Sequence, residues 1–140
     1  MPSGPSYQSA VTSGFNSWRL SNFGMETDIT VTIDSSARDS GATPTTKLRA
    51  GLVLGKITAS GKYKEYDNAA SDGSQTAVGI LANDVLLIDA AGTAQDVPGT
   101  MAMICEVDSG NLIGYDANAL ADFEAAGKNT MVVVRNSTAP

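Results

Sequence analysis

Along most of this chain, short runs of apolar and β-branched residues alternate with clusters of Gly, Ser, Asp and Asn. The first clear run is Met25 to Ile33, where three aliphatic side chains alternate with two threonines. A period of two sends alternate side chains to opposite faces, so this run predicts a half-buried β-strand. The Ser/Gly/Thr/Pro-rich stretch that follows, Asp34 to Thr46, predicts a linker with turns at Asp39-Ser40-Gly41 and Thr43-Pro44.

A β-hairpin is predicted next. Leu52 to Thr58 is almost entirely apolar or β-branched, and Lys62 to Tyr66 alternates charged and aromatic side chains. Between these runs lies a turn of small residues in which Gly61 can take a positive φ without steric cost. The alternation places Tyr63 and Tyr66 on opposite faces, so one face of the return strand can be buried and the other wetted.

A polar loop, Asp67 to Ser74, leads from this hairpin into the apolar run Thr76 to Ala82. Gly79 interrupts that run, and a glycine inside a strand usually marks a bulge or a close approach of another backbone. The remaining predicted strands and their turn are Val85 to Ile88, a turn at Ala90-Ala91-Gly92, Ala94 to Val97, Thr100 to Val107 and Met131 to Val134.

One helix is predicted near the end of the chain. Asp116 is a good N-cap for a helix that starts at Ala117, and Leu120 and Phe123 fall on one face. Gly127 stands where a left-handed C-cap is expected.

These elements predict a mainly β fold with one short helix. A chain of 140 residues is the size of a single domain and can bury a sizeable core. We expect this organisation: an extended N-terminal arm (1–25), a strand and Ser/Thr/Gly linker (26–47), a compact β-rich domain (48–136) and a tail (137–140).

Charge is distributed unevenly, with a formal net charge of -6. From Glu65 to Gly127 the chain has no Lys or Arg, which argues against nucleic-acid binding through this region. A solvated acidic surface is the simplest interpretation, and a surface for a basic partner is the alternative. The acidic residues are Glu65, Asp67, Asp72, Asp84, Asp89, Asp96, Glu106, Asp108, Asp116, Asp122 and Glu124.

Catalytic and metal-binding patterns are weak. The chain has no histidine, which excludes Ser-His and Cys-His nucleophiles and every zinc site that needs histidine. Cys105 is the single cysteine and is most simply a small core residue. Glu106 and Asp108 could share a strand face, but alternation on a solvent face gives the same spacing. The loop Asp67 to Gly73 lacks the closing bidentate Glu of a calcium loop. We therefore expect that the protein is not an enzyme and binds no cofactor or metal ion.

The N-terminal segment differs from the rest. Residues 1–25 contain one charge and four of the eight aromatic residues, with little periodicity. Large aromatics spaced along an extended segment are typical of an arm that docks on a partner, and folding back on its own domain is the alternative. The candidate docking residues, which extend into the following strand, are Tyr7, Phe15, Trp18, Arg19, Leu20, Phe23, Ile29 and Val31.

The order A-G-x-V-L-G-K-I-T-x-S-G-K-Y, then a polar loop, then A-V-G-I-L-x-x-D-V resembles the head decoration proteins of tailed bacteriophages, the lambda-like protein D family. The resemblance is close from Leu48 to Val85 and looser through the helix to Arg135. It implies a compact domain of the β-clip or β-tulip kind and no enzymatic activity. It also implies a homotrimer that caps threefold and quasi-threefold sites on the outer surface of an expanded capsid. Residues 1–47 depart from the family, whose arm is usually shorter and lacks so clear a strand.

Two functions follow. The first is a capsid decoration protein made in the host cytoplasm and located on the virion, with the major capsid protein as its partner. The second is a monomeric β-rich module that binds carbohydrate or a host surface through Tyr63, Tyr66 or Trp18. No apolar run is long enough to span a bilayer, so neither function involves a membrane.

Overall fold

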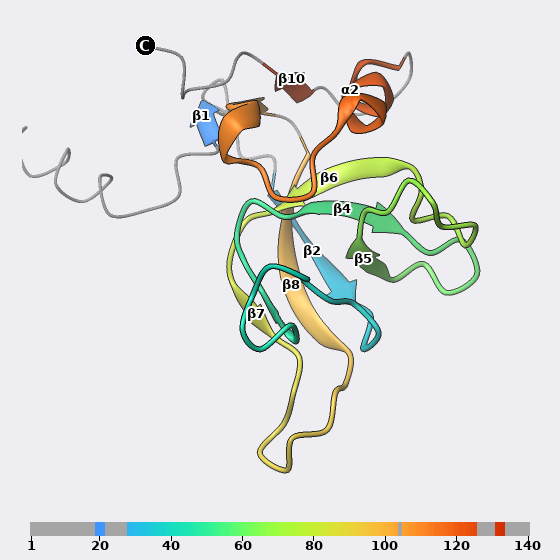
Figure 1. The fold of residues 1–140 in the computed structure, drawn as a ribbon, viewed down its shortest axis with the longest axis vertical. Helices are drawn as coiled ribbons and strands as arrows, with labels where there is room; N and C mark the ends of the chain where they lie inside the picture. Colours follow the sequence, from blue (N-terminus) through green and yellow to red (C-terminus); the bar gives the residue numbers. More distant parts are fainter. Residues whose placement is uncertain (1–18, 22–27, 104, 126–130, 134–140) are drawn as a thin grey trace, which may run out of the picture.

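The computed structural model describes residues 19–21, 28–103, 105–125 and 131–133 (Figure 1). Its described part is mainly β with one short α-helix, which confirms the predicted fold class. The elements are β1 (Arg19–Ser21), β2 (Asp28–Ile33), β3 (Lys47–Leu48), β4 (Val53–Lys56), β5 (Tyr63–Glu65), β6 (Ala77–Leu81), β7 (Val85–Leu86), β8 (Val97–Ala102), β9 (Cys105–Val107), the 3-10 turn η1 (Ser109–Asn111), α2 (Ala117–Glu124) and β10 (Met131–Val133).

Five strands close into a small barrel in the order β2-β5-β4-β6-β8. The longest pairing is antiparallel, between β2 and β8, and runs from Asp28 opposite Ala102 to Ile33 opposite Val97. Ile33 also pairs in parallel with Tyr63 of β5, which closes the ring. Closure pairs every barrel strand on both sides, so β2 belongs to the same body as the strands that come later in the sequence.

β4, β6 and the last residues of β8 bury both of their faces. Leu54, Leu81 and Met101 belong to one core cluster, whereas their neighbours along the same strands belong to a second. The second cluster lies under α2 and is Val53, Tyr66, Ala77, Ile80, Ala102, Val107, Ala119 and Phe123. Two-sided burial explains why β4 and β6 are almost continuously apolar in sequence rather than alternating.

Gly79 has both roles that the sequence predicted for it. The pairing of β4 with β6 shifts between Leu54 opposite Gly79 and Gly55 opposite Ala77, which marks a bulge. A Cβ on Gly79 would lie 2.9 Å from the carbonyl oxygen of Ala102 and 2.6 Å from the Sδ of Met101, so the backbone of β8 lies too close for a side chain here.

The predicted strand from Thr100 to Val107 is wrong in its bounds. β8 starts at Val97, runs through Pro98 and Gly99 and ends at Ala102, and β9 is a separate strand of another sheet. Within β8, β6 pairs only with Met101 and Ala102, so β8 has a single neighbour at Pro98. The N–H that proline lacks is not needed there, and the strand continues.

The helix begins as predicted and ends earlier. Asp116 is the N-cap of α2, but its C-cap is Ala125 in an extended conformation (φ -66, ψ 142). The C-cap role predicted for Gly127 is therefore wrong, and Gly127 itself lies outside the described residues. The buried face is Ala119 and Phe123, one turn apart, whereas Leu120 is half-buried.

The predictions for the 34–46 linker and for the return strand of the hairpin also change. The linker at 34–46 has no strand, as expected, yet it packs against the barrel: Ala37 and Asp39 are 0% and 1% exposed. The return strand β5 has no fully solvent-exposed face, because Tyr63, Lys64 and Glu65 are all half-buried. Barrel closure covers the face that an isolated hairpin would expose.

A second, open sheet lies at one end of the barrel, in the order β1-β9-β10. β1 is antiparallel and β10 parallel to β9, so Arg19, Val107 and Val133 lie in one row across the sheet. At the other end a hairpin from Leu87 to Asp96 extends away from the barrel (Figure 1). No helix in the described ranges is long and apolar enough to cross a membrane.

Candidate functional site

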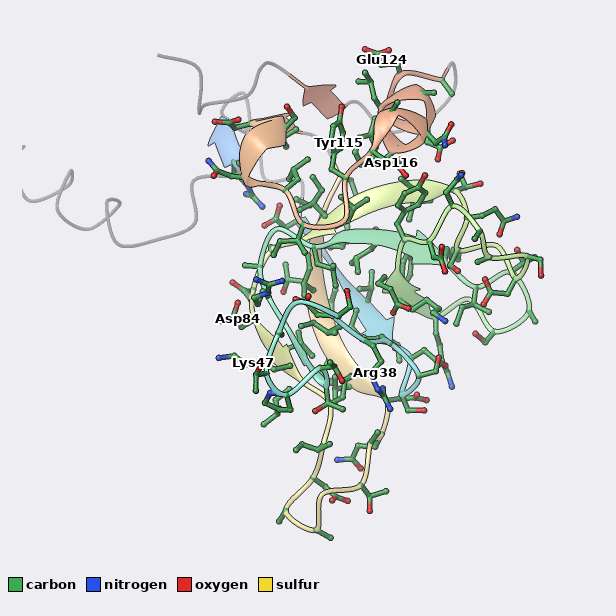
Figure 2. The ribbon with its side chains drawn as sticks, in the orientation of Figure 1. Arg38, Lys47, Asp84, Tyr115, Asp116 and Glu124 are labelled. Atoms are coloured by element: carbon green, nitrogen blue, oxygen red, sulfur yellow. The ribbon has the colours of Figure 1, made fainter. Side chains whose placement is uncertain are left out.

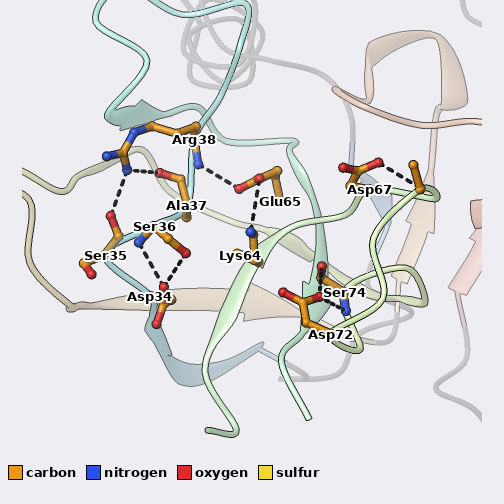
Figure 3. A network of polar contacts seen from close by, with 11 residues as sticks. Asp34, Ser35, Ser36, Ala37, Arg38, Lys64, Glu65, Asp67, Asp72 and Ser74 are labelled. Atoms are coloured by element: carbon orange, nitrogen blue, oxygen red, sulfur yellow. Dashed lines mark hydrogen bonds and ion pairs between the residues drawn. The ribbon is translucent and has the colours of Figure 1, made fainter. Parts of the chain in front are cut away.

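Six of the 15 acidic residues hold backbone turns, so they do more than form a solvated surface. Six aspartates accept a hydrogen bond from the backbone N–H two residues later, and each second residue is Ser, Gly or Ala. This local geometry is an Asx-turn, which the spacing Asp-x-small could have revealed. The six are Asp34, Asp39, Asp67, Asp72, Asp89 and Asp108, and Figure 3 shows those near β5.

Other carboxylates join segments that are distant in the sequence. Asp96 accepts from the N–H of Ser35 (2.8 Å) and Asp84 from the N–H of Ala50 (2.8 Å). Glu65 accepts from the N–H of Arg38 (2.7 Å), which ties the 34–46 loop to β5 (Figure 3). A hydrogen bond to an ionised acceptor is stronger than a neutral one, so these contacts fix the loops on the barrel.

The Asp39–Arg49 ion pair contains the most buried carboxylate of the ion pairs that the structure describes. The Arg49 guanidinium donates to both carboxylate oxygens of Asp39 at 2.8 Å, and Asp39 is 1% exposed. These side-chain hydrogen bonds lower the pKa of Asp39 below its ordinary value of 3.8, while burial opposes the shift. The pair ties the loop between β2 and β3 to the residue that follows β3.

Two aspartates attach helix α2 to the barrel. The Oδ1 of Asp116 accepts from the N–H of Ala119 (2.8 Å) and from the hydroxyl of Tyr66 (2.9 Å). Asp122 accepts from the N–H of Ala77, at the start of β6 (2.8 Å). Burial, followed by the hydrogen bond to Asp116, raises the pKa of Tyr66 well above its usual range. Neither of the two long-range contacts, Tyr66–Asp116 and Ala77–Asp122, has a local signal in the sequence.

Of Glu106 and Asp108, the two carboxylates weighed for acid/base chemistry, only Glu106 lies on a strand. Asp108 lies beyond the end of β9, is 2% exposed, and caps the 3-10 turn η1 by accepting from the N–H of Gly110. The expectation that it shares a strand face with Glu106 is therefore wrong. Among the described residues, no group of three or more Cys, Asp or Glu could hold a metal ion.

The tyrosine platform expected for a surface-binding module is also absent from the exposed surface. Tyr66 is 6% exposed and its hydroxyl is committed to Asp116. Tyr63 is half-buried, with the ammonium of Lys56 5.7 Å from its ring centroid. Trp18 lies outside the described residues.

The predicted docking residues fall into three groups. The side chains of Tyr7, Phe15, Trp18, Leu20 and Phe23 lie outside the described part. Arg19 lies on β1 and donates two hydrogen bonds to Asp28, at 3.0 and 2.9 Å, so the last part of the predicted arm pairs with its own domain. Ile29 is 40% exposed, whereas Val31 is 7% exposed inside the barrel and cannot reach a partner unless the barrel opens.

Few large apolar side chains are exposed among the described residues. Ile29 and Leu86, which is 52% exposed, are the exposed large apolar residues of the described part. Figure 2 shows Glu124 and Asp116 at the helix end of the molecule, and Arg38 and Lys47 on the half nearer the hairpin. Asp84 lies near Lys47 in the same view, and ion pairs such as Asp39–Arg49 and Asp96–Lys62 join acidic to basic side chains on this half.

The described chain is a closed barrel with an appended open sheet, and its polar side chains are used largely to fix loops and the helix. These features define a class, a small β-rich structural domain. The sequence model for bacteriophage lambda head decoration protein D matches residues 24–130, and the chain belongs to that family. No curated protein sequence matches the chain.

The family match locates this protein in the capsid of a phage and makes its role structural. The matched range includes the strands of the barrel and the helix α2. It begins at residue 24, so Tyr7, Phe15, Trp18, Arg19, Leu20 and Phe23 precede it.

Proposed function

We propose that this protein decorates the head of a tailed phage as a homotrimer. Three chains bind at threefold and quasi-threefold sites on the outside of the expanded head and hold neighbouring capsomers together against the pressure of packaged DNA. The observation that carries this proposal is the family match over residues 24–130. The chain is made in the host cytoplasm and joins the head from there.

The mechanism is one of linked equilibria. A ligand that binds only one state of a shell stabilises that state, and decoration favours the expanded geometry in this way. If each subunit contributes one docking arm, a trimer gains avidity of about two to four orders of magnitude over a single arm when the geometry matches.

Sedimentation with two particle types tests the function. The purified chain should pellet with expanded empty heads and stay in the supernatant with unexpanded procapsids. Equal binding to both would contradict the state-selective mechanism, and binding to neither would contradict decoration itself. Light scattering coupled to gel filtration, repeated on protein released from heads, should give three chains per particle.

The alternative, a monomeric module for carbohydrate or a host surface, has less support. It relies on exposed aromatic side chains, and Tyr66 is buried against the helix. A chain that stays monomeric in solution and also forms no trimers on heads would support the binding module instead.

A further inference from the structure

The sequence contains one dipeptide that is prone to a spontaneous modification of the backbone. Asp72-Gly73 is the sole Asp-Gly pair in the chain, and no Asn-Gly pair occurs. In a flexible peptide an Asp-Gly pair converts readily to isoaspartate, because glycine rotates freely and has no side chain to block ring closure. We propose that Asp72-Gly73 is a latent isoaspartate site, and that Ser74, Gln75 and the adjoining strand β4 block its ring closure in the folded protein.

The modification is an isomerisation that passes through a cyclic imide. The Gly73 nitrogen attacks Cγ of the protonated Asp72 carboxyl, an N–Cγ bond forms, and the amide proton leaves with the carboxyl OH as water. Water then adds to the main-chain carbonyl carbon of Asp72 and breaks its bond to the Gly73 nitrogen. The backbone now runs through Cβ and Cγ of Asp72, and the former carbonyl group is a carboxylate. Asp72 is exposed, so the water for the second step is available.

The nucleophile of this reaction is engaged by Gln75. The N–H of Gly73 donates to the Oε1 of Gln75 at 2.8 Å, and both residues are half-buried. An amide oxygen is an acceptor but a very weak base, so this contact keeps the proton on the nitrogen. Ring closure would have to break the hydrogen bond and leave the Gln75 oxygen without its donor.

The electrophile is engaged by Ser74. The Oδ1 of Asp72 accepts from the hydroxyl of Ser74 (2.6 Å) and from its N–H (3.0 Å), as Figure 3 shows. The hydroxyl, followed by the N–H, lowers the pKa of Asp72 below its ordinary value of 3.8. The protonated carboxyl that ring closure needs is therefore rarer than in a flexible peptide. Ser74 is 0% exposed, so packing fixes the position of both donors.

The backbone of the pair is held against the end of β4. The Asp72 carbonyl accepts from the N–H of Thr58 at 2.8 Å. A Cβ on Gly73 would lie 2.5 Å from the Lys56 carbonyl oxygen and 2.4 Å from the Oγ1 of Thr58. Ring closure requires the peptide group between Asp72 and Gly73 to rotate toward the Asp72 side chain, and these contacts restrict that rotation.

The same contacts show what isomerisation would damage. The Asp72 carbonyl that accepts from Thr58 would become a charged carboxylate, and the backbone would gain one carbon between Asp72 and Gly73. The 67–74 loop would then lose its close backbone approach to β4.

Ageing of the full-length chain tests the proposal. Wild type is incubated at physiological temperature and pH, folded in buffer and, as the unrestrained reference, unfolded in guanidinium chloride. The endoproteinase Asp-N cleaves before aspartate but not before isoaspartate, so lost cleavage before residue 72 measures the modified fraction. Folded wild type should convert at least about tenfold more slowly than the unfolded chain, because the reaction requires local opening of the loop.

Substitutions separate the restraints from general stability. Gln75→Ala and Ser74→Ala should each convert at least about threefold faster than folded wild type, as expected for the loss of one hydrogen bond. Gln95→Ala is the matched control, the same change at an exposed position of the hairpin, and should convert at the wild-type rate. Val31→Ala truncates the barrel core, keeps both contacts, and should also convert at the wild-type rate.

Three results would overturn the proposal. The first is an equal rate in folded and unfolded wild type, and the second is a wild-type rate in both loop variants. The third is a rise in Val31→Ala as large as in Gln75→Ala, because the reaction would then pass through global unfolding rather than through release of the loop.

Discussion

At the scale of single residues, aspartate side chains accept many of the hydrogen bonds that hold turns and loops in this domain. The same residue type closes short turns locally and reaches across the sequence to cap backbone groups at Ser35, Ala50 and Ala77. Residues 65–127 contain no Lys or Arg, yet many of their carboxylates have partners. Backbone N–H groups donate hydrogen bonds to them in place of cations.

Asp116 gives the first prediction. Asp116→Ala removes the N-cap of α2 and leaves the buried Tyr66 hydroxyl without its acceptor, so the free energy of unfolding should fall by about 2–4 kcal/mol. Asp116→Asn is the matched control, since asparagine caps equally well and its carbonyl can accept from Tyr66; it should cost less than about 1 kcal/mol. Urea unfolding measures both, and equal costs for the two variants would contradict the shared-acceptor role.

Asp39 gives the second prediction, on acid stability. Its folded pKa is lowered, chiefly by the hydrogen bonds from Arg49, so its ionised form favours the folded state at every pH above the ordinary value of 3.8. That contribution is lost as the pH falls from 3.8 through the lowered folded value. Unfolding midpoints in urea from about pH 6 to about pH 2 should therefore drop less steeply below 3.8 in Asp39→Asn than in wild type.

The matched control is Glu124→Gln, since the Glu124 side chain is exposed at the end of α2. It should keep the wild-type acid slope. An Asp39→Asn slope identical to wild type would mean that other carboxylates dominate acid unfolding.

At the scale of elements, glycines decide how closely the loops approach the barrel. Gly55 and Gly73 let the 67–74 loop lie against β4: a Cβ on Gly55 would come within 2.4 Å of the Ser74 carbonyl oxygen. The loop that could have been mistaken for a cation site is instead packed backbone to backbone on a strand.

Substitution of Gly73 gives the third prediction. Its φ is +111, and an added Cβ would meet the Lys56 carbonyl oxygen at 2.5 Å, so Gly73→Ala should destabilise the protein by at least about 2 kcal/mol. Gly92→Ala is the control, because Gly92 also has a positive φ (+84) but open space around it. The control should cost only the backbone strain, about 1 kcal/mol. Thermal unfolding compares the two, and similar losses would show that crowding at β4 is not limiting.

At the scale of the whole molecule, the predicted arm, residues 1–25, includes β1, which pairs with β9. Arg19 to Ser21 pairs with β9, and the Arg19–Asp28 ion pair holds that strand in place. A deletion to Met25 would remove a strand of the domain together with the arm, whereas a deletion of residues 1–18 separates the two.

The fourth prediction uses that shorter deletion. The chain without residues 1–18 should keep its circular dichroism spectrum, yet bind expanded heads at least about 100-fold more weakly because the arm's avidity is lost. A full-length chain with Tyr7, Phe15 and Trp18 changed to Ser is the matched control and should bind as weakly. If the truncated chain still saturated heads at the wild-type concentration, docking would belong to the barrel domain.

The sequence by itself determined the local features of this protein. The strand ending at Ile33, the hairpin turn at Gly61, the bulge at Gly79 and the N-cap at Asp116 each depend on neighbouring residues and their intrinsic preferences. The family was also readable from the order of glycines and apolar residues between Leu48 and Val85.

Only the tertiary structure decided which strands close the barrel and what the carboxylates do. Local pattern cannot show that Pro98 has a strand on one side alone, or that Tyr66 turns inward to meet Asp116. These outcomes depend on residues far away in sequence: the Tyr66–Asp116 contact spans 50 positions and the Ser35–Asp96 contact spans 61. A buried polar group takes whichever partner packing brings within reach, and the folded chain alone sets that choice.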